Sequence, residues 1–127
     1  MLRNLIFIAA VTVVAAMLSP TTALAAGDAA AGKPIFDINC MSCHGMTGKG
    51  DGPVGAVLPP PRPRDFSKGE VKFDGDADGT PGQDADLRAV IVQGAAAFGG
   101  SPLMAPWPSL SEADLANLIA YIRSLKE

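Results

Sequence analysis

Cys40, Cys43 and His44 stand close together in the chain, and Gly45 follows them. Two thiols separated by two residues, with an imidazole directly after the second thiol, is the spacing typical of covalent haem attachment. In that arrangement the two sulfurs add to the two vinyl groups of the porphyrin, and the adjacent imidazole binds the iron. His44 is the only histidine of the 127 residues, so no other side chain can supply that imidazole.

Other functions of the same three residues explain the pattern less well. A redox dithiol of the thioredoxin type is found in a strand–helix–strand setting, and no strand-like segment precedes Cys40. A structural zinc site needs four ligands, whereas the chain has two cysteines and one histidine, so a carboxylate would have to join them. A disulfide at this spacing is geometrically awkward, although an oxidising compartment would permit it. Only haem attachment uses all three residues.

The first 25 residues are typical of an export signal. Arg3 gives the N-terminal region a positive charge, and an apolar run of residues 5–18 follows. Small residues then precede a cleavage site after Ala25. The run of 14 residues is shorter than the roughly 20 that a membrane-spanning helix needs, so an uncleaved anchor is the weaker alternative. We therefore expect an exported protein with no stable membrane insertion after cleavage.

Residues 26–127 are long enough for one small domain. Arg3 is the only charged side chain of the signal, so its removal changes the formal net charge from −3 to −4. A mildly acidic domain without a basic stripe makes nucleic acid an improbable partner. A domain of this size with few aromatic residues has a thin core, which a buried porphyrin would fill.

Met104 is the candidate ligand for the second face of a haem. It lies 60 residues after His44, between Pro102 and Pro106, which hold the chain extended. A buried methionine more often serves packing than ligation. The other methionines are unsuitable, since they lie between the cysteines (Met41), too close to the histidine to cross the porphyrin (Met46), or within the signal (Met1, Met17).

The apolar periodicity predicts an all-α fold with three helices. Residues 28–44 form the first, in which Pro34 implies either a late start or a bend near Gly32. Residues 84–93 form the second, closed by Gly94, although Thr80-Pro81-x-Gln83 also resembles a capping box that would start it earlier. The third begins after Ser111 and carries an apolar stripe made of Leu115, Leu118, Ile119, Ile122 and Leu125.

The proline-rich stretch of residues 58–66 is predicted to form a wall around the haem, with a linker or a peptide ligand as the alternative. A carbonyl of Pro53 or of Pro59–Pro61 would accept the ring N–H of His44. Either arginine of the stretch, Arg62 or Arg64, would pair with a haem propionate. Further along, Trp107 would pack on the haem edge, although plain burial in the core explains it equally well.

An acidic stretch, residues 74–79, imitates the start of a calcium-binding loop with carboxylates at positions 1, 3 and 5 and glycine at position 6. Position 12 is Ala85 where such loops have glutamate, which favours a solvated acidic loop over a calcium site. Together with Asp84 and Asp86 the stretch would form a patch that steers a basic partner.

Taken together, the chain resembles the class I mono-haem cytochromes c of the bacterial periplasmic type. The resemblance covers nearly all of residues 26–127. The motifs that carry it are Gly32, Phe36, Cys40-x-x-Cys43-His44-Gly45, Gly48-x-Gly50-Asp51-Gly52-Pro53, Met104-Ala105-Pro106-Trp107 and Leu118-Ile119-Ala120-Tyr121-Ile122. In sequence, residues 58–66 resemble the corresponding segment of periplasmic members more than that of the mitochondrial carrier. The lysine-rich docking face of the mitochondrial carrier is missing from this chain.

The resemblance implies a small fold in which three or more helices wrap around one covalently attached haem c. It implies thioether bonds from Cys40 and Cys43, with His44 and Met104 as the axial ligands of the iron. It further implies a periplasmic carrier of single electrons between redox proteins, with no enzymatic activity. The rival function is a haem-based gas sensor or a peroxidase-like protein, which would require a weak bond from Met104.

Overall fold

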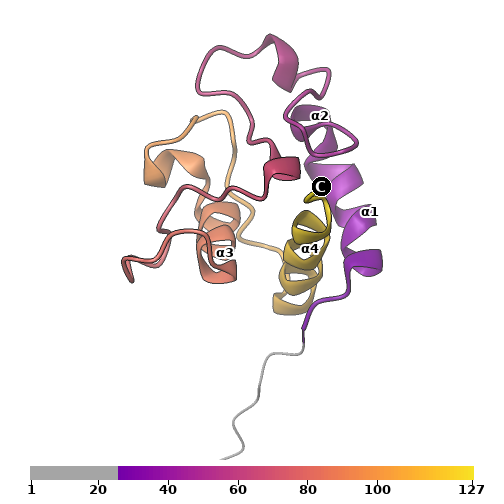
Figure 1. Ribbon diagram of the computed structural model, residues 1–127, viewed down its shortest axis with the longest axis vertical. Coiled ribbons are helices and arrows are strands. Elements are labelled where there is room, and N and C mark those ends of the chain that lie inside the picture. Colours follow the sequence, from indigo (N-terminus) through magenta and orange to yellow (C-terminus); the bar gives the residue numbers. More distant parts are fainter. Residues whose placement is uncertain (1–25) are drawn as a thin grey trace, which may run out of the picture.

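The computed structural model describes residues 26–127, and in this range it contains helices and no strands. The elements are α1 (Ala29–Asn39), α2 (Met41–His44), α3 (Asp84–Gln93) and α4 (Glu112–Ser124), with the short 3-10 helices η1 (Gly55–Val57), η2 (Phe66–Lys68) and η3 (Ala95–Phe98). The expected all-α fold is therefore confirmed (Figure 1). The predicted export signal, residues 1–25, lies outside the described residues. Between residues 26 and 127, no helix is long and apolar enough to span a bilayer.

The first predicted helix is in fact two helices. Asp28 caps α1 by accepting a hydrogen bond from the backbone N–H of Ala30 at 2.8 Å, so the helix begins early and includes Pro34. At Cys40 the backbone leaves the helical region (φ −121°, ψ −30°), and α2 starts at the next residue. The prediction of one continuous helix over residues 28–44 was wrong at this position. The break separates the turn that carries Cys43 and His44 from the longer helix before it.

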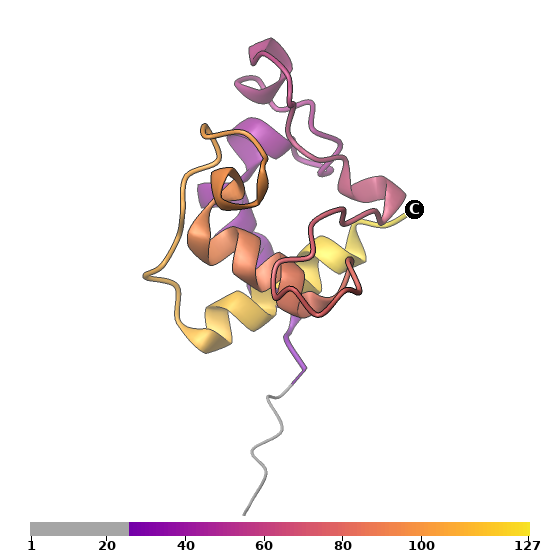
Figure 2. The same cartoon turned by 90° about the vertical axis from the view of Figure 1, so that its left-hand side faces the viewer.

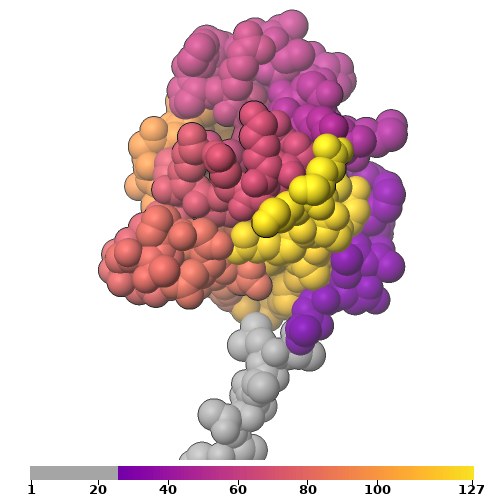
Figure 3. Space-filling model, in the orientation of Figure 1, coloured from indigo at the N-terminus to yellow at the C-terminus, as the bar shows by residue number. Residues whose placement is uncertain are grey.

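Helices α1 and α4 cross at Gly32, and the ribbon and space-filling views both show them side by side (Figures 1 and 3). A Cβ atom on Gly32 would lie 1.9 Å from the backbone oxygen of Asn117, so only glycine permits this approach. Next to the crossing, the rings of Phe36 and Tyr121 meet edge to face with centroids 5.2 Å apart. Tyr121 therefore lies beside both the glycine and the phenylalanine at the crossing.

Gly32→Val is expected to reduce the free energy of unfolding by about 3 kcal/mol or more, because the added side chain must push α4 away from α1. The matched control is Ala31→Val, which adds a β-branched side chain to the neighbouring exposed position of the same helix. Chemical denaturation of the two variants measures the difference. Equal losses in both variants would show that helix propensity, and not the close approach, accounts for the effect.

The end of helix α3 and the start of helix α4 are those that the sequence predicted. Helix α3 is closed by Gly94, whose positive φ (80°) favours glycine. Helix α4 is capped by Ser111, whose hydroxyl accepts a hydrogen bond from the N–H of Asp114 at 3.1 Å. The buried core combines α1, α3 and α4 with η2, and its members are Phe36, Phe66, Leu87, Ile91, Leu115, Leu118, Ile119 and Ile122.

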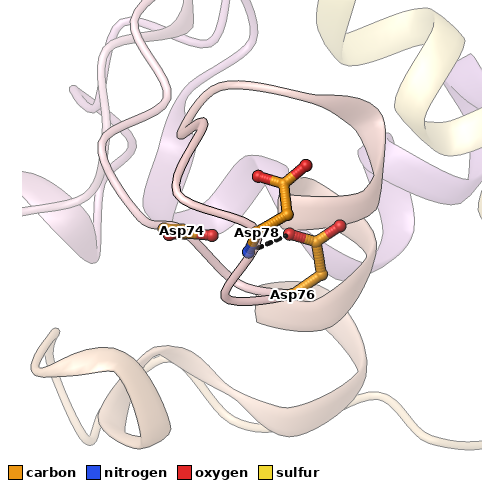
Figure 4. Close-up of side chains that lie close together, drawn as sticks. All are labelled: Asp74, Asp76 and Asp78. Carbon is orange, nitrogen blue, oxygen red and sulfur yellow. Dashed lines mark hydrogen bonds between the residues drawn. The ribbon is translucent and has the colours of Figure 1, made fainter.

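The acidic stretch forms a turn that is closed by its own hydrogen bonds (Figure 4). Carboxylate oxygens of Asp74, Asp76 and Asp78 come within 4.8 Å of one another. These side chains accept hydrogen bonds from the loop backbone, at Gly79, Asp78 and Thr80 respectively. The geometry of the loop therefore follows from local capping of its N–H groups.

Asp86 does not belong to an exposed acidic patch, and this part of the prediction was wrong. Its side chain is fully buried and accepts hydrogen bonds from the N–H groups of Gly75, Gly82 and Gln83 at 2.6–2.7 Å. Burial alone would raise the pKa of the Asp86 carboxyl, but the backbone donors outweigh burial and hold the pKa below its usual value. Asp86 thus ties the acidic stretch to the start of α3.

Asp86→Asn is expected to lower the melting temperature at pH 7 by about 5 °C or more, because it replaces one accepting oxygen by an NH2 group that faces backbone groups which are themselves donors. Since the pKa of Asp86 is lowered by folding, its contribution is present above about pH 4 and is lost as the pH falls through the folded-state pKa. Wild type should therefore lose more stability than the variant between pH 7 and pH 3. The control is Asp84→Asn, at an exposed position two residues away, and an equal effect there would contradict the assignment.

Candidate functional site

The structure places the four predicted site residues around one cavity of about 290 Å³. Cys40, Cys43 and His44 line it from the break between α1 and α2, and Met104 lines it from the loop that follows η3. In the rotated view both segments lie in the upper left part of the molecule (Figure 2). The rest of the lining is mainly apolar and includes Leu58, Val71, Leu87, Ile91, Leu118 and Ile122.

The His44 ring is buried, with 8% of the residue exposed, and two neighbours fix it. Its Nδ1 atom lies 3.3 Å from the backbone oxygen of Arg64, and the Phe66 ring stacks on it with centroids 4.7 Å apart. Burial lowers the pKa of His44, so the imidazole is neutral at neutral pH. Neutral imidazole has one N–H, and a carbonyl at Nδ1 requires that Nδ1 carries it. Nε2 then has the lone pair that a metal ion needs.

The carbonyl beside His44 belongs to a different residue from the one predicted. The candidates from sequence were Pro53 and Pro59–Pro61, whereas the structure brings Arg64 to the ring. Of these candidates Pro61 lines the cavity, together with Leu58 and Pro63 of the same stretch. Residues of the 58–66 stretch thus form one side of the cavity, and the carbonyl beside the His44 ring is corrected to that of Arg64.

Cys40 and Cys43 are half-buried free thiols at the edge of the cavity. Burial, with a smaller contribution from the neighbouring Cys43, raises the pKa of the Cys40 thiol to about 11. Among the described residues, the group of side chains close enough together to hold a metal ion is that of Asp74, Asp76 and Asp78, so the two cysteines and the histidine do not gather as a zinc site requires. Both sulfurs lie at the margin of an apolar space.

Met104 is held in place by the segment between α3 and α4. The backbone oxygen of Met104 accepts a hydrogen bond from the N–H of Ala95 at 3.4 Å, and the N–H of Trp107 donates to Ile91 at 2.9 Å. Gly94 allows this segment to approach, because a Cβ there would lie 3.0 Å from the same Met104 oxygen. The segment is thereby fastened to the end of α3, and the half-buried thioether side chain faces the same cavity as His44.

The basic side chains of the wall have partners of their own. The Arg62 guanidinium donates to the backbone oxygen of Ala56 at 2.7 Å, and that of Arg64 lies 5.6 Å from the centre of the Phe73 ring. Both arginines and Lys72 line the cavity. Positive groups at the margin of an apolar space suit a ligand with an apolar body and acidic substituents, as a porphyrin with propionates has.

The residues present therefore fit a haem: two thiols for its vinyl groups, an imidazole and a thioether for its iron, and apolar walls for its ring. A family model described as Cytochrome c matches residues 29–126. The chain belongs to the cytochrome c family. This cytochrome c accordingly binds haem c covalently and takes part in electron transport.

Two known proteins show the similarity in detail. This cytochrome c is 40% identical to cytochrome c-554(547) of Halothiobacillus neapolitanus over 106 residues, which are 80% of this chain and 100% of that protein. A chain of the Kuenenia stuttgartiensis reducing HAO-like protein complex has a similar structure, with a TM-score of 0.61 and 31% identity. The match covers 76% of this cytochrome c and 41% of that longer chain.

Sequence reasoning missed two parts of the site. The stacking partner Phe66 was named only as the end of the proline-rich stretch, and the short helix η3 is not among the three helices that the sequence predicted. A signal for Phe66 was present, since an aspartate precedes it and a glycine follows three residues later, which is a pattern for a short capped turn. No neighbouring residue in the sequence, however, predicts that this turn packs on His44.

Proposed function

We propose that this cytochrome c is an exported single-electron carrier, with Cys40 and Cys43 as the thioether residues and with His44 and Met104 as the ligands of the iron. The observation that supports it is the convergence of these four side chains, from separate segments, on one apolar cavity. Haem bound there supplies an iron that takes up and returns one electron. The protein's residues determine how readily this happens and what else can reach the iron.

His44 serves as a neutral ligand with a fixed tautomer. The Arg64 carbonyl accepts the Nδ1 proton, which leaves Nε2 as the ligand atom and makes the imidazole more basic. Burial keeps water away from the ring, so this hydrogen bond does not compete with solvent. A flip of the imidazole ring would break the hydrogen bond from Nδ1 to the Arg64 carbonyl.

Met104 adds a neutral thioether, which favours the ferrous over the ferric state in comparison with harder ligands. The apolar lining acts in the same direction, because ferric haem has one more positive charge than ferrous haem. The reduction potential is therefore expected to be high for a haem protein. With imidazole and thioether both in place, no position is left for oxygen or peroxide, and the function is electron transfer without substrate chemistry.

The partners of such a carrier are other redox proteins. A net charge of −4 after cleavage of the signal gives the domain a mildly acidic surface. Exposed acidic side chains, including Asp76, Asp78 and Asp84, gather at the turn before α3 and at its start. We expect this charge to favour partners with a basic docking face and to make the association rate fall with rising ionic strength.

Carbon monoxide added to the ferrous protein at neutral pH tests this function against a gas sensor or peroxidase. If His44 and Met104 both bind the iron, carbon monoxide does not change the Soret band, and added peroxide does not oxidise a dye. Rapid carbon monoxide binding by the wild type would favour the rival function, since it requires an open or weakly bound position on the Met104 side. The measurement uses the exported holoprotein, with denatured holoprotein as the positive control.

A further inference from the structure

The His44 imidazole lies in a stack with the Phe66 ring. The two rings are 18° from parallel, with centroids 4.7 Å apart. Phe36 is also near the histidine, at 6.4 Å, but its ring is inclined by 52° and is not stacked. Phe36 meets Phe66 edge to face at 6.4 Å and 68°. One aromatic ring therefore covers a face of the imidazole, and a second ring supports the first.

The backbone around Phe66 leaves little freedom to its ring. The N–H of Phe66 donates to the oxygen of Gly48 at 2.7 Å, and Asp65 caps η2 by accepting from the N–H of Ser67 at 3.0 Å. The turn ends at Gly69 in a left-handed conformation (φ 65°). A Cβ on Gly48 would lie 3.3 Å from a ring carbon of Phe66, so the ring is in contact with backbone on that side. Phe66 itself is 9% exposed.

The hydrogen bond and the stack restrain different motions of the imidazole. The contact from Nδ1 to the Arg64 oxygen fixes the direction in which one ring atom points, but the ring plane can still rotate about that direction. The nearly parallel Phe66 ring opposes such rotation, because an imidazole turned out of the stack would collide with the phenyl face. Both restraints together define one plane.

We propose that Phe66 is a positioning residue that sets the plane of the His44 imidazole at the iron. The inference rests on the proposed function, in which Nε2 of His44 is an iron ligand. Orientation of axial ligands by residues behind them is a general feature of metal sites. Here the orienting group is an aromatic face in addition to a carbonyl.

The orientation of the imidazole plane has a spectroscopic consequence in the ferric holoprotein. The plane of the imidazole, together with the orientation of the thioether, would determine how unpaired spin is distributed over the pyrrole rings. The haem methyl resonances in the proton NMR spectrum therefore shift by different amounts, in an order that reports the ligand plane. Loss of stability alone leaves that order unchanged as long as the protein is folded.

The test compares Phe66→Leu with Phe36→Leu in the ferric holoprotein. Both changes remove a phenyl ring from the same cluster, but only Phe66 is stacked on His44. We expect Phe66→Leu to change the order or the spread of the haem methyl shifts and Phe66→Tyr to retain them. Phe36→Leu should lower the melting temperature, since this side chain is 0% exposed, and should retain the methyl pattern.

A measurement on the wild type alone covers the case in which Phe66→Leu does not fold. In the ferrous, diamagnetic holoprotein, nuclear Overhauser effects are expected between ring protons of Phe66 and His44. Their absence would overturn the inference, as would an unchanged methyl pattern in Phe66→Leu or an equal change in Phe36→Leu. Haem-loaded protein in which Nε2 of His44 does not bind the iron would overturn the proposed function instead, and the inference with it.

Discussion

Replacing Cys40 and Cys43 together by serine is expected to give a polypeptide that has no covalently bound haem and has lost most of its helical structure. Without thioether bonds the haem can dissociate, and the cavity at the centre of the core is then lined by apolar side chains in contact with water. A small domain whose core depends on a cofactor loses folding free energy when the cofactor is absent. Mass spectrometry and far-ultraviolet circular dichroism measure the two effects.

Ser42→Ala is the matched control for this double variant. Ser42 lies between the two cysteines and is exposed, so its hydroxyl is not expected to contribute to haem binding. The control should retain the haem mass and the helical signal of the wild type. A double serine variant that keeps full helicity without haem would contradict the view that the cofactor completes the core.

Met104→Ala is expected to remove the weak charge-transfer band that a sulfur–iron bond gives near the red end of the oxidised spectrum. It should also lower the reduction potential by on the order of 0.1 V, a fraction of the roughly 0.8 V over which axial ligands tune haem. The physical reason is the loss of the thioether that favours ferrous iron, together with entry of water at the vacated side. Absorption spectroscopy and a redox titration measure both changes.

The control for this prediction is Met46→Ala. Met46 is 71% exposed and lies two residues after His44, so its thioether cannot cross to the other side of the haem. Both the band and the potential should be those of the wild type. If Met46→Ala abolished the band and Met104→Ala did not, the assignment of the sulfur ligand would be wrong.

Features that depend on neighbouring residues could be predicted from the sequence. The start of α4 followed from Ser111 and the end of α3 from Gly94, because caps act within a few residues. The α1–α4 crossing is formed by Gly32, Phe36 and Tyr121, which are among the positions that carry the family resemblance. Likewise, the convergence of Cys40, Cys43, His44 and Met104 on one cavity agrees with what the motif and the elimination of the other methionines indicated.

Features that depend on how the loops fold back could not be predicted. The carbonyl beside His44 comes from Arg64, twenty residues away, and several carbonyls of the same proline-rich wall were equally plausible acceptors from sequence. Asp86 was expected on the surface because charged side chains are usually exposed. Its burial depends on three backbone N–H groups that surround it only after the acidic stretch has closed over α3.

The break at Cys40 shows the same limit. The positions Gly32, Phe36, Cys40 and Cys43 follow a helical period across the break. Neither proline nor glycine stands at Cys40 or next to it. Hydrophobic periodicity predicts which side chains face the core, but it does not predict a change of backbone angles at one residue. The structure shows that the change falls at the first residue of the haem-attachment motif.

X-ray absorption at the iron edge of the oxidised holoprotein tests the central proposal most directly, because it reports which elements are bonded to the iron. The proposed ligation by His44 and Met104 predicts one directly bonded sulfur together with nitrogen ligands, and it predicts that the sulfur is absent in Met104→Ala. Iron bonded to nitrogen and oxygen alone in the wild type would contradict the proposal.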